Sequence, residues 1–471
     1  MNNDFEYFNS DDFRKCLKEY ERARDRGTTM FLDVNDFADI ADYYNQMGNS
    51  SEAMTAIRHG LDIFPGEAVL LSYIIRSDLH MNQDAQSAKM HLEMISDTSD
   101  PEYFYCMIEI LLTEGEKDVV DQEINKKYLE IDTEEHDDFV TDIAEIYTDY
   151  LYTSEAKKWL GKTDDKKSID YKELCGRIAM AEGDYASCIH IYQQLLDDNP
   201  FSCEYWDNLA TAQMQTDQYY DAITSCDYSL AISPDNLIPL RNKANALYAI
   251  GDYEKAIEAY TELSKADPDD AVPHLSIGAA QMNLGNYSAA VEQLKYAERI
   301  NRTNIDSPLN ADITRELAIA LSRLKKTEEA LTYSEKYKDY SGNIPETNVL
   351  KGHIYLEAGD SDTAIAFFSK AVNDPLADSG TTLRIAISFY DIGETEMAYE
   401  LFKEICYKIG DEKAWPYIAL CAKDLGKRNE YLDCLKHACE KVPDETRLVL
   451  GDSFPTELNV AEYYDYERNN K

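Results

Sequence analysis

A pattern of apolar and polar positions at residues 251–268, GDYEKAIEAYTELSKADP, recurs along the chain. A Gly-Asp turn opens the stretch, and Ala256, Ile257 and Tyr260 then follow at spacings that place them on one helical face. Pro268 closes it, because proline has no amide proton and its ring clashes with the preceding turn. The pattern therefore predicts an amphipathic helix bounded by a turn and a proline.

A marker residue, usually small, occupies the same place near the start of each such helix, at intervals of 32 to 36 residues with one interval of 40. A second small residue often lies twelve positions earlier, which predicts a preceding helix packed closely against the first. Such a fixed period indicates a repeat architecture, here of twelve helix hairpins. The twelve markers are Ala53, Ala88, Val120, Ala156, Cys188, Ala222, Ala256, Ala290, Ala330, Ala364, Ala398 and Tyr431.

Both ends of the chain depart from the period. Residues 1–33 contain one amphipathic stretch, roughly 11–26, which we expect to cover the first hairpin, since terminal repeats need a polar outer face. Residues 444–471 are acidic and tyrosine-rich, with Tyr463, Tyr464 and Tyr466. They are interpreted as a capping helix or as a peptide-like segment. The long interval before Ala330 predicts an insertion in the loop 302–310.

Composition narrows the function classes. The 471 residues carry a formal net charge of −44, from 46 basic and 90 acidic residues, which argues against nucleic-acid binding. The start lacks a basic and apolar leader, and no apolar run approaches the ~18 residues of a membrane span, so we expect no membrane insertion and a cytoplasmic location. The ten cysteines form no CxxC pair and are expected to be reduced core residues.

Nothing in the sequence indicates an active site, so the chain is not expected to be an enzyme or to bind a cofactor. The eight histidines are scattered, with no metal-ligand spacing. Gly161, Lys162 and Thr163 resemble the end of a phosphate-binding loop, but Ala156 stands where that motif needs glycine. The acidic runs 132–138 and 164–170 are interpreted as solvated loops.

The paired small residues, the aromatic positions between them and the closing prolines resemble the tetratricopeptide repeat (TPR) over about residues 34–443. The resemblance, to a long bacterial-type array, implies an all-α, right-handed α-α superhelical solenoid of about twelve TPR helix hairpins with capping helices. Repeats one to four (34–168) are degenerate, with Arg76 where a small residue is expected, and repeats five to twelve (169–443) are regular.

The resemblance also implies that the first helix of each hairpin turns one face into a concave groove. Arginines on repeats seven to nine of that face suit an acidic segment, because guanidinium groups bind carboxylates in a bidentate way. The alternative is a solvated face with intramolecular ion pairs worth about 0–1 kcal/mol each. The groove positions that carry over are Arg177, Arg241, Asn245, Tyr248, Met282, Arg315, Arg323, His353 and Tyr390.

One specialised form of this groove, the carboxylate clamp for acidic chaperone tails, fits poorly. Arg241 and Asn245 are spaced like its first pair of residues. Ser276 replaces its second asparagine, and Asp312 and Glu316 occupy its basic positions. The clamp is therefore not expected here.

The function expected from this resemblance is a non-enzymatic scaffold or adaptor that binds a protein or peptide partner in the groove. The alternative is a self-occluded regulatory protein, whose acidic C-terminal tail occupies the groove until it is displaced. The sequence sets neither the partner nor the oligomeric state.

Overall fold

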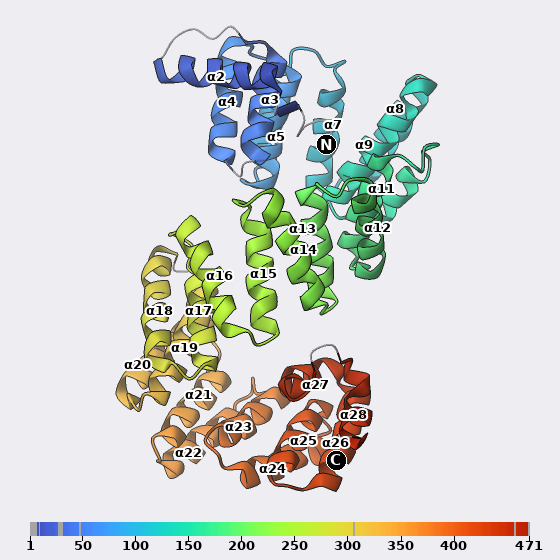
Figure 1. Ribbon diagram of the computed structural model, residues 1–471. Coiled ribbons are helices and arrows are strands. Elements are labelled where there is room, and N and C mark those ends of the chain that lie inside the picture. Colours follow the sequence, from blue (N-terminus) through green and yellow to red (C-terminus); the bar gives the residue numbers. More distant parts are fainter. Residues whose placement is uncertain are drawn as a thin grey trace. The chain divides into compact units, whose positions relative to one another are not determined.

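The computed structural model describes residues 7–8, 10–26, 32–46, 49–304, 307–455 and 458–469, and in these ranges the chain is helical with no strands. It divides into two compact units, Met1–Tyr205 and Trp206–Lys471 (Figure 1). The described helices include twelve hairpins, five in the first unit and seven in the second, as the period predicts. The predicted change from degenerate to regular repeats after residue 168 concerns the sequence pattern, and it stays a prediction.

The first unit begins with α2 (Asp11–Arg26). Its hairpins are α3 (Val34–Gln46) with α4 (Ser50–Ile63), α5 (Ala68–His80) with α6 (Ala85–Leu92), α7 (Pro101–Thr113) with α8 (Lys117–Glu130), α9 (His136–Asp149) with α10 (Thr153–Leu160), and α11 (Ile169–Glu182) with α12 (Tyr185–Asp198).

The second unit takes in most of α13 (Cys203–Gln215), which pairs with α14 (Tyr219–Ile232). The following hairpins are α15 (Leu237–Ala249) with α16 (Tyr253–Ala266), α17 (Val272–Asn283) with α18 (Tyr287–Ile300), α19 (Leu309–Arg323) with α20 (Thr327–Ser341), α21 (Ile344–Glu357) with α22 (Ser361–Val372), α23 (Ser379–Asp391) with α24 (Thr395–Glu404), and α25 (Trp415–Asp424) with α26 (Arg428–Lys441). The unit ends with α27 (Pro443–Leu450) and α28 (Tyr463–Asn469).

Each hairpin turn contains one residue in the left-handed backbone region, five positions before the marker, in all eleven repeats where that position is described. Seven of these residues are glycines, which reach positive φ without a steric penalty. The other four, Gln83, Leu151, Asp217 and Lys325, have φ between 51° and 60°. The turn geometry is thus kept even where the sequence offers no glycine.

The close approach predicted between the two helices of a hairpin is present. All twelve marker residues are buried. On the facing helix, a Cβ atom added at Gly278 would lie 2.7 Å from Cγ and Cδ2 of Leu294, so the α17–α18 hairpin has no room for even one more methyl group. Small residues are therefore a packing requirement at these positions.

The turn of repeat two differs from the other turns, which bears on why Arg76 stands where the repeat pattern calls for a small residue. Its turn is closed by a hydrogen bond from the Asp84 N–H to the Asp78 carbonyl, six residues back, whereas Asp252 reaches Leu247, five residues back. We attribute the outward position of Arg76 to this extra residue. The guanidinium contacts α7 instead of α6, with Nε 2.9 Å from Glu109 Oε1.

The ends of the array are covered as expected. Phe13 and Tyr20 of α2 are buried in a cluster with Phe37 and Ile57 of the first hairpin. At the other end, Phe454 stacks on Tyr463 of α28 with ring centroids 3.9 Å apart. The inserted loop before α19 is partly described, and in it Asn301 donates a buried 2.9 Å hydrogen bond to Asn310.

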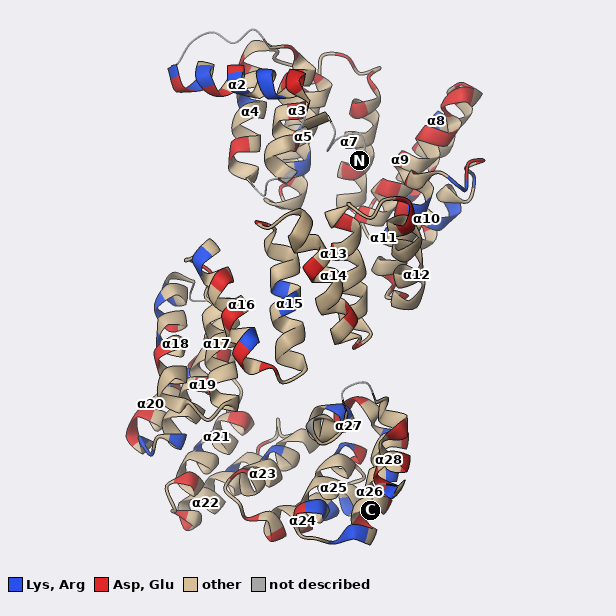
Figure 2. Cartoon of the chain, viewed as in Figure 1, with Lys and Arg blue, Asp and Glu red and all other residues tan. Residues whose placement is uncertain are grey.

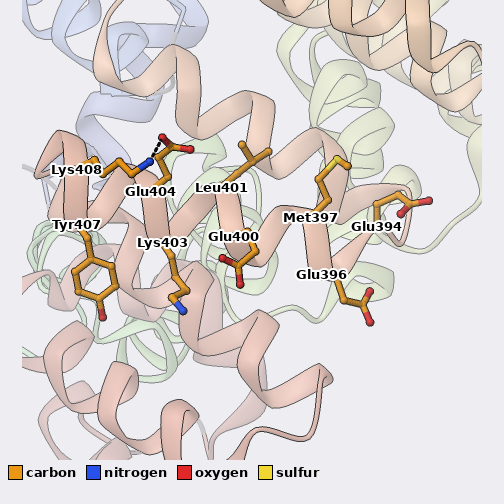
Figure 3. Close-up of a pocket in the computed structure, with 9 residues that line it drawn as sticks. All are labelled: Glu394, Glu396, Met397, Glu400, Leu401, Lys403, Glu404, Tyr407 and Lys408. Atoms are coloured by element: carbon orange, nitrogen blue, oxygen red, sulfur yellow. Dashed lines mark hydrogen bonds and ion pairs between the residues drawn. The ribbon is translucent and has the colours of Figure 1, made fainter.

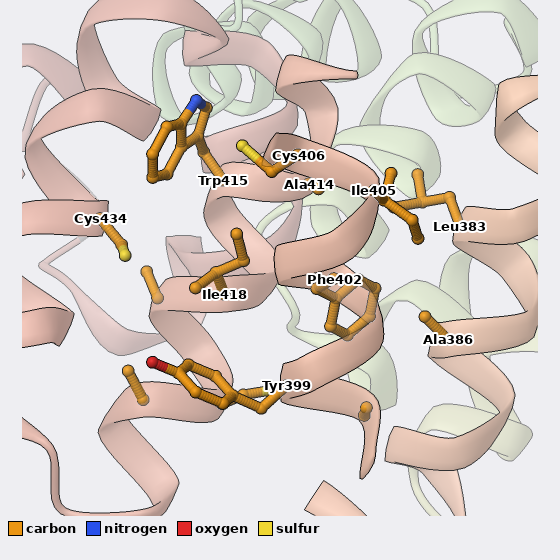
Figure 4. Packing of buried hydrophobic residues seen from close by; sticks show 14 of the residues in the cluster. Leu383, Ala386, Tyr399, Phe402, Ile405, Cys406, Ala414, Trp415, Ile418 and Cys434 are labelled. Atoms are coloured by element: carbon orange, nitrogen blue, oxygen red, sulfur yellow. The ribbon is translucent and has the colours of Figure 1, made fainter. Parts of the chain in front are cut away.

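Continuous apolar packing joins neighbouring hairpins within a unit. In the last three hairpins, Leu383 of α23, Phe402 of α24 and Ile418 of α25 belong to one buried cluster (Figure 4). First helices also lie against one another, as α19 does against α21 and α21 against α23. We call the exposed surface of the first helices of the second unit, the side on which the predicted groove would lie, the first-helix face.

Replacing Leu151 by glycine should stabilise the first unit. Leu151 has φ 60° and is 73% exposed, so its side chain strains the backbone and gains little from packing. Glycine removes a backbone strain of about 1–2 kcal/mol, but it also raises the conformational entropy of the unfolded chain. The net gain in unfolding free energy should be about 0.5–1 kcal/mol. Thermal unfolding checks this result. Leu129→Gly, at another exposed leucine but in helical backbone, should destabilise instead, and a loss of stability in Leu151→Gly would contradict the strain.

Replacing Gly278 by alanine should destabilise the second unit by about 1–3 kcal/mol, because the new methyl group overpacks the hairpin. Intrinsic helix propensity favours alanine by about 1 kcal/mol, so a measured loss must come from the contact. Urea unfolding of Gly278→Ala, Leu294→Ala and the double variant measures the coupling between the two sites. The double variant should lose less than the sum of the single variants, and strict additivity would show that no clash exists.

Candidate functional site

The nine residues predicted to line a groove fall in both units. Arg177 lies on α11 of the first unit, and the other eight lie on α15, α17, α19, α21 and α23 of the second unit. These five helices are the first helices of consecutive hairpins, and the eight residues are distributed along them. Acidic positions are distributed over the helices of both units (Figure 2).

Arg177 is held by its own unit. Its Nη1 atom lies 2.6 Å from Glu145 Oε1 and its Nη2 atom 2.5 Å from Asp149 Oδ1, both on α9 of the preceding hairpin. Burial raises the pKa of Asp149 even though the guanidinium opposes that shift. Arg177 therefore joins two neighbouring first helices.

Arg315 belongs to a chain of charges in the N-terminal halves of α19, α21 and α23. Its Nη2 atom is 3.1 Å from Glu316 Oε1. Glu346 of α21 is ion-paired with Arg384 of α23 and also lies in the field of Arg315. Burial raises the pKa of Glu346, although both guanidinium groups oppose it. The chain of charges links three consecutive repeats.

A second chain of charges lies at the C-terminal ends of the same helices. Arg323 is ion-paired with Glu357 of α21, and its Nη2 atom is 3.6 Å from Asp391 Oδ2 of α23. Lys325 adds a 2.7 Å contact to Glu357. Next along the face, the Tyr390 hydroxyl donates a 2.7 Å hydrogen bond to Asp424 of α25.

His353 of α21 lies between these two chains and is only 6% exposed. Its Nε2 atom has no hydrogen-bond partner among the described residues. Burial, with Arg323 and Lys325 nearby, lowers its pKa from 6.5 to about 4, and Glu357 offsets a part of this shift. The imidazole is therefore neutral at physiological pH.

The first-helix face is more open on α15 and α17. The Arg241 side chain is 54% exposed, and its ion pair with Asp270 spans 3.6 Å. Asn245 accepts a 2.7 Å hydrogen bond from the Tyr260 hydroxyl, and the Tyr248 hydroxyl accepts one of 2.9 Å from Asn283. Met282 is half-buried beside them. The loosest of the predicted arginines is thus Arg241.

Two residues that the sequence analysis missed add to this open part. Ile238 on α15 is 59% exposed and Val272 on α17 is 44% exposed, and they occupy equivalent places in repeats seven and eight. A signal for them was present, because Ile238 lies one turn before Arg241 and so shares its helical face. An apolar residue beside a half-exposed arginine suits a partner with both kinds of group.

The C-terminal tail contacts the last hairpin. The Arg428 Nη1 atom of α26 lies 2.6 Å from Glu467 Oε2 of α28, and Tyr417 of α25 donates a 2.8 Å hydrogen bond to Glu445 of α27. These contacts give the described part of the tail the capping position. They offer no support for a tail seated along α15–α23.

Other chemistry is absent from the part of the chain that the structure describes. No group of three or more His, Cys, Asp or Glu side chains is arranged to hold a metal ion. None of the described helices is both long and apolar enough to cross a bilayer. The ten cysteines are free thiols, and burial raises the pKa of Cys188 to about 11.

Family models of the tetratricopeptide repeat match residues 244–285, 275–344 and 345–373, which run from α15 to the end of α22. The chain is a tetratricopeptide repeat protein. Proteins with this repeat generally mediate protein–protein interactions.

Curated relatives match parts of this TPR chain. It is 30% identical over 127 residues to the small glutamine-rich tetratricopeptide repeat-containing protein 2 of Mycosarcoma maydis. The matched segment covers 27% of this chain and 36% of the relative. It is 23% identical to the tetratricopeptide repeat and J domain-containing co-chaperone DNJ1 of Fusarium oxysporum f. sp. lycopersici, over 41% and 37% of the two chains. The TPR chain thus spans little more than a third of the length of these relatives.

A solved tetratricopeptide repeat protein from Parabacteroides merdae is 18% identical, with 53% of this chain and 97% of that one covered at a TM-score of 0.44. A second structure, the APC/C hetero-tetramer Cut9–Hcn1, covers 89% of this chain and 90% of that one at 12% identity and a TM-score of 0.32. At these scores the likenesses add nothing to the family assignment.

His353 should make the second unit less stable in acid. Its folded pKa is about 4 against 6.5 unfolded, so its contribution is complete above pH 6.5 and is lost as the pH falls toward 4. Between pH 7.5 and 5 this group should remove about 2 kcal/mol of unfolding free energy. Urea unfolding followed by Trp206 and Trp415 fluorescence, in a Trp159→Phe background, reports on this unit.

The non-titrating variant His353→Gln is the control, because it keeps the other ionisable groups that face the site. Its unfolding free energy should fall less between pH 7.5 and 5 than that of the parent. Equal falls in the two proteins would show that the histidine takes up protons equally well in the folded and unfolded states.

Proposed function

We propose that this protein is a non-enzymatic scaffold that binds a segment of a partner protein on the first-helix face, in the groove that the TPR resemblance implies. The observation that carries the proposal is the contrast along this face. Arg323 of α19 is held by carboxylates of the two following repeats and Arg315 is paired with Glu316 on its own helix, whereas Arg241 on α15 is half-exposed and beside exposed Ile238.

Charge supports the choice of α15 and α17 over α19–α23. A partner carboxylate that approached Arg323 would have to displace Glu357 and Asp391. These two carboxylates belong to the same chain, so their pairing with Arg323 carries no entropic cost of association. At Arg241 the competing carboxylate is Asp270, at 3.6 Å. An incoming carboxylate could therefore form the shorter, bidentate pair that Asp270 does not form.

The apolar side chains on the same two helices define the rest of the partner. Ile238 and Val272 expose large parts of their surfaces, and Met282 is an unbranched, adaptable side chain. We expect the bound segment to carry an acidic residue that reaches Arg241 and aliphatic or aromatic residues that cover Ile238 and Val272. The large negative charge elsewhere would repel acidic segments that lack these apolar anchors.

We also propose a cytoplasmic location. All ten cysteines are free, and most are buried within hairpins, which suits a reducing compartment.

Site-specific photo-crosslinking tests the binding face. A benzoylphenylalanine residue at position 238 or 272 should capture the same partner from a lysate of the native cell. The same probe at exposed position 258 on α16 should not capture it, and Arg241→Glu should abolish the capture at both inner positions.

The matched control is Arg302→Glu, which makes the same charge change at an exposed arginine after α18. It should leave the crosslink unchanged. Equal crosslinking from positions 238 and 258, or a crosslink that survives Arg241→Glu, would contradict binding on the first-helix face. Arg323 is a poor test site, because its reversal would break the ion pairs that join repeats nine to eleven.

A further inference from the structure

The outer side of α24 carries a surface that the proposed groove does not use. Ala398, Tyr399 and Phe402 point into the core, so the opposite side of the helix faces away from it. That side lines a hollow of about 710 Å³ (Figure 3). It runs from Glu394 to Lys408 and lies on the second helix of its hairpin, away from the first-helix face.

Two rows of side chains border this hollow. Glu396, Glu400, Lys403 and Tyr407 form one row at helical spacing, and Met397, Leu401, Glu404 and Lys408 form the other. In Figure 3, Glu396, Glu400 and Lys403 project to the same side of α24. We call Met397 and Leu401, with Tyr407 at the far end, the apolar strip, and Glu396 with Glu400 the acidic strip.

The apolar strip is not a general feature of the repeats. Met397 directly precedes the marker Ala398, and the residues that directly precede Ala256 and Ala290 are Lys255 and Ala289. Met397 is 50% exposed and Tyr407 is 62% exposed. Tyr407 packs against Trp415, with ring centroids 5.5 Å apart, but both side chains leave at least half of their surfaces exposed.

The helix geometry changes at the same place. The last turn after α24, Ile405–Ile409, is a π-helix, a rare form that is frequent at functional sites. Ile405 and Cys406 are both buried, while Tyr407 and Ile409 are exposed. Of these, the Tyr407 side chain lines the end of the hollow.

The acidic strip lacks internal partners. Glu404 is paired with Lys408 at 2.7 Å, but Glu396 and Glu400 form no ion pair within the described residues. They stand four residues apart on one helix, where two like charges repel each other. Lys403 does not relieve them fully, because it lies over the Tyr399 ring, 4.9 Å from the ring centroid. A cation from outside the chain would relieve that repulsion.

We propose that this surface of α24 is a second docking site, which binds a short basic amphipathic helix of a partner protein. Apolar side chains of that helix cover Met397, Leu401 and Tyr407, and its lysines or arginines pair with Glu396 and Glu400. The two rows span about 17 Å, which matches about three turns of a bound helix. With the groove on the first-helix face, this site would let one chain hold two different segments.

The test uses the full chain with labelled methionine methyl groups and a synthetic probe. The probe is a fluorescent helical peptide of about 14 residues, with leucines on one face and lysines on the other. A second peptide carries glutamates in place of the lysines. Fluorescence anisotropy measures affinity, and the Met397 methyl signal, assigned with Met397→Leu, reports the place of binding.

The basic peptide should bind, shift the Met397 signal and lose about tenfold or more in affinity with Glu396→Lys/Glu400→Lys. The matched control is Glu258→Lys/Glu262→Lys, which reverses two exposed glutamates at the same spacing on α16, where no apolar row accompanies them. It should leave affinity within about twofold of the parent. Met397→Ser should weaken binding without any change of charge.

Three outcomes would overturn the proposal. Equal losses in the two charge-reversal variants would show non-specific attraction to an acidic protein. Equal binding of the acidic peptide would remove the role of Glu396 and Glu400. A Met397 shift caused by raising the protein concentration alone would assign the surface to a second copy of this chain. None of these results affects the test at Arg241, so the two sites succeed or fail separately.

Discussion

The close approach of two helices within each hairpin is the constraint on which the rest of the structure depends. A small residue on each helix permits it, and a left-handed residue five positions before the marker reverses the chain so that the two helices meet there. At Gly278 and Leu294 the contact leaves no room for one added methyl group. Because the same geometry recurs, each hairpin presents its first helix to the same side, and side chains about 34 residues apart become neighbours.

The proximity of residues about 34 positions apart explains the ion pairs between successive first helices. Arg323 meets Glu357 and Asp391 because the three residues hold equivalent places on α19, α21 and α23. In the first unit, Arg76 with Glu109 and Arg177 with Glu145 follow the same rule. In a chain with a net charge of −44, each such arginine lies near carboxylates of the adjoining repeat. Arg76, Arg177 and Arg323 therefore join repeats, and the surface left for a partner is smaller by these positions.

The two candidate docking surfaces arise where this regular pattern is interrupted. On α15 and α17, exposed Ile238 and Val272 replace the charged residues of later repeats, and Arg241 keeps a loose partner. On α24, Met397 and Tyr407 accompany unpaired glutamates and a π-helical turn. One surface has a cation beside apolar groups and the other has anions beside apolar groups. They consequently favour segments of opposite charge, which would reduce competition between two partners.

The sequence by itself determined the number of hairpins, the marker residues and the capped ends, since these depend on a local spacing of small, apolar and turn residues that recurs in most repeats. It also predicted eight groove residues that lie on consecutive first helices of the second unit. The tertiary structure decided which of them are available, because an ion pair between Arg323 and Glu357 depends on how two helices 34 residues apart are stacked. It likewise decided the outward position of Arg76, where one extra residue in a turn rotates the helix register, a change too small for a period of 32 to 36 residues to reveal.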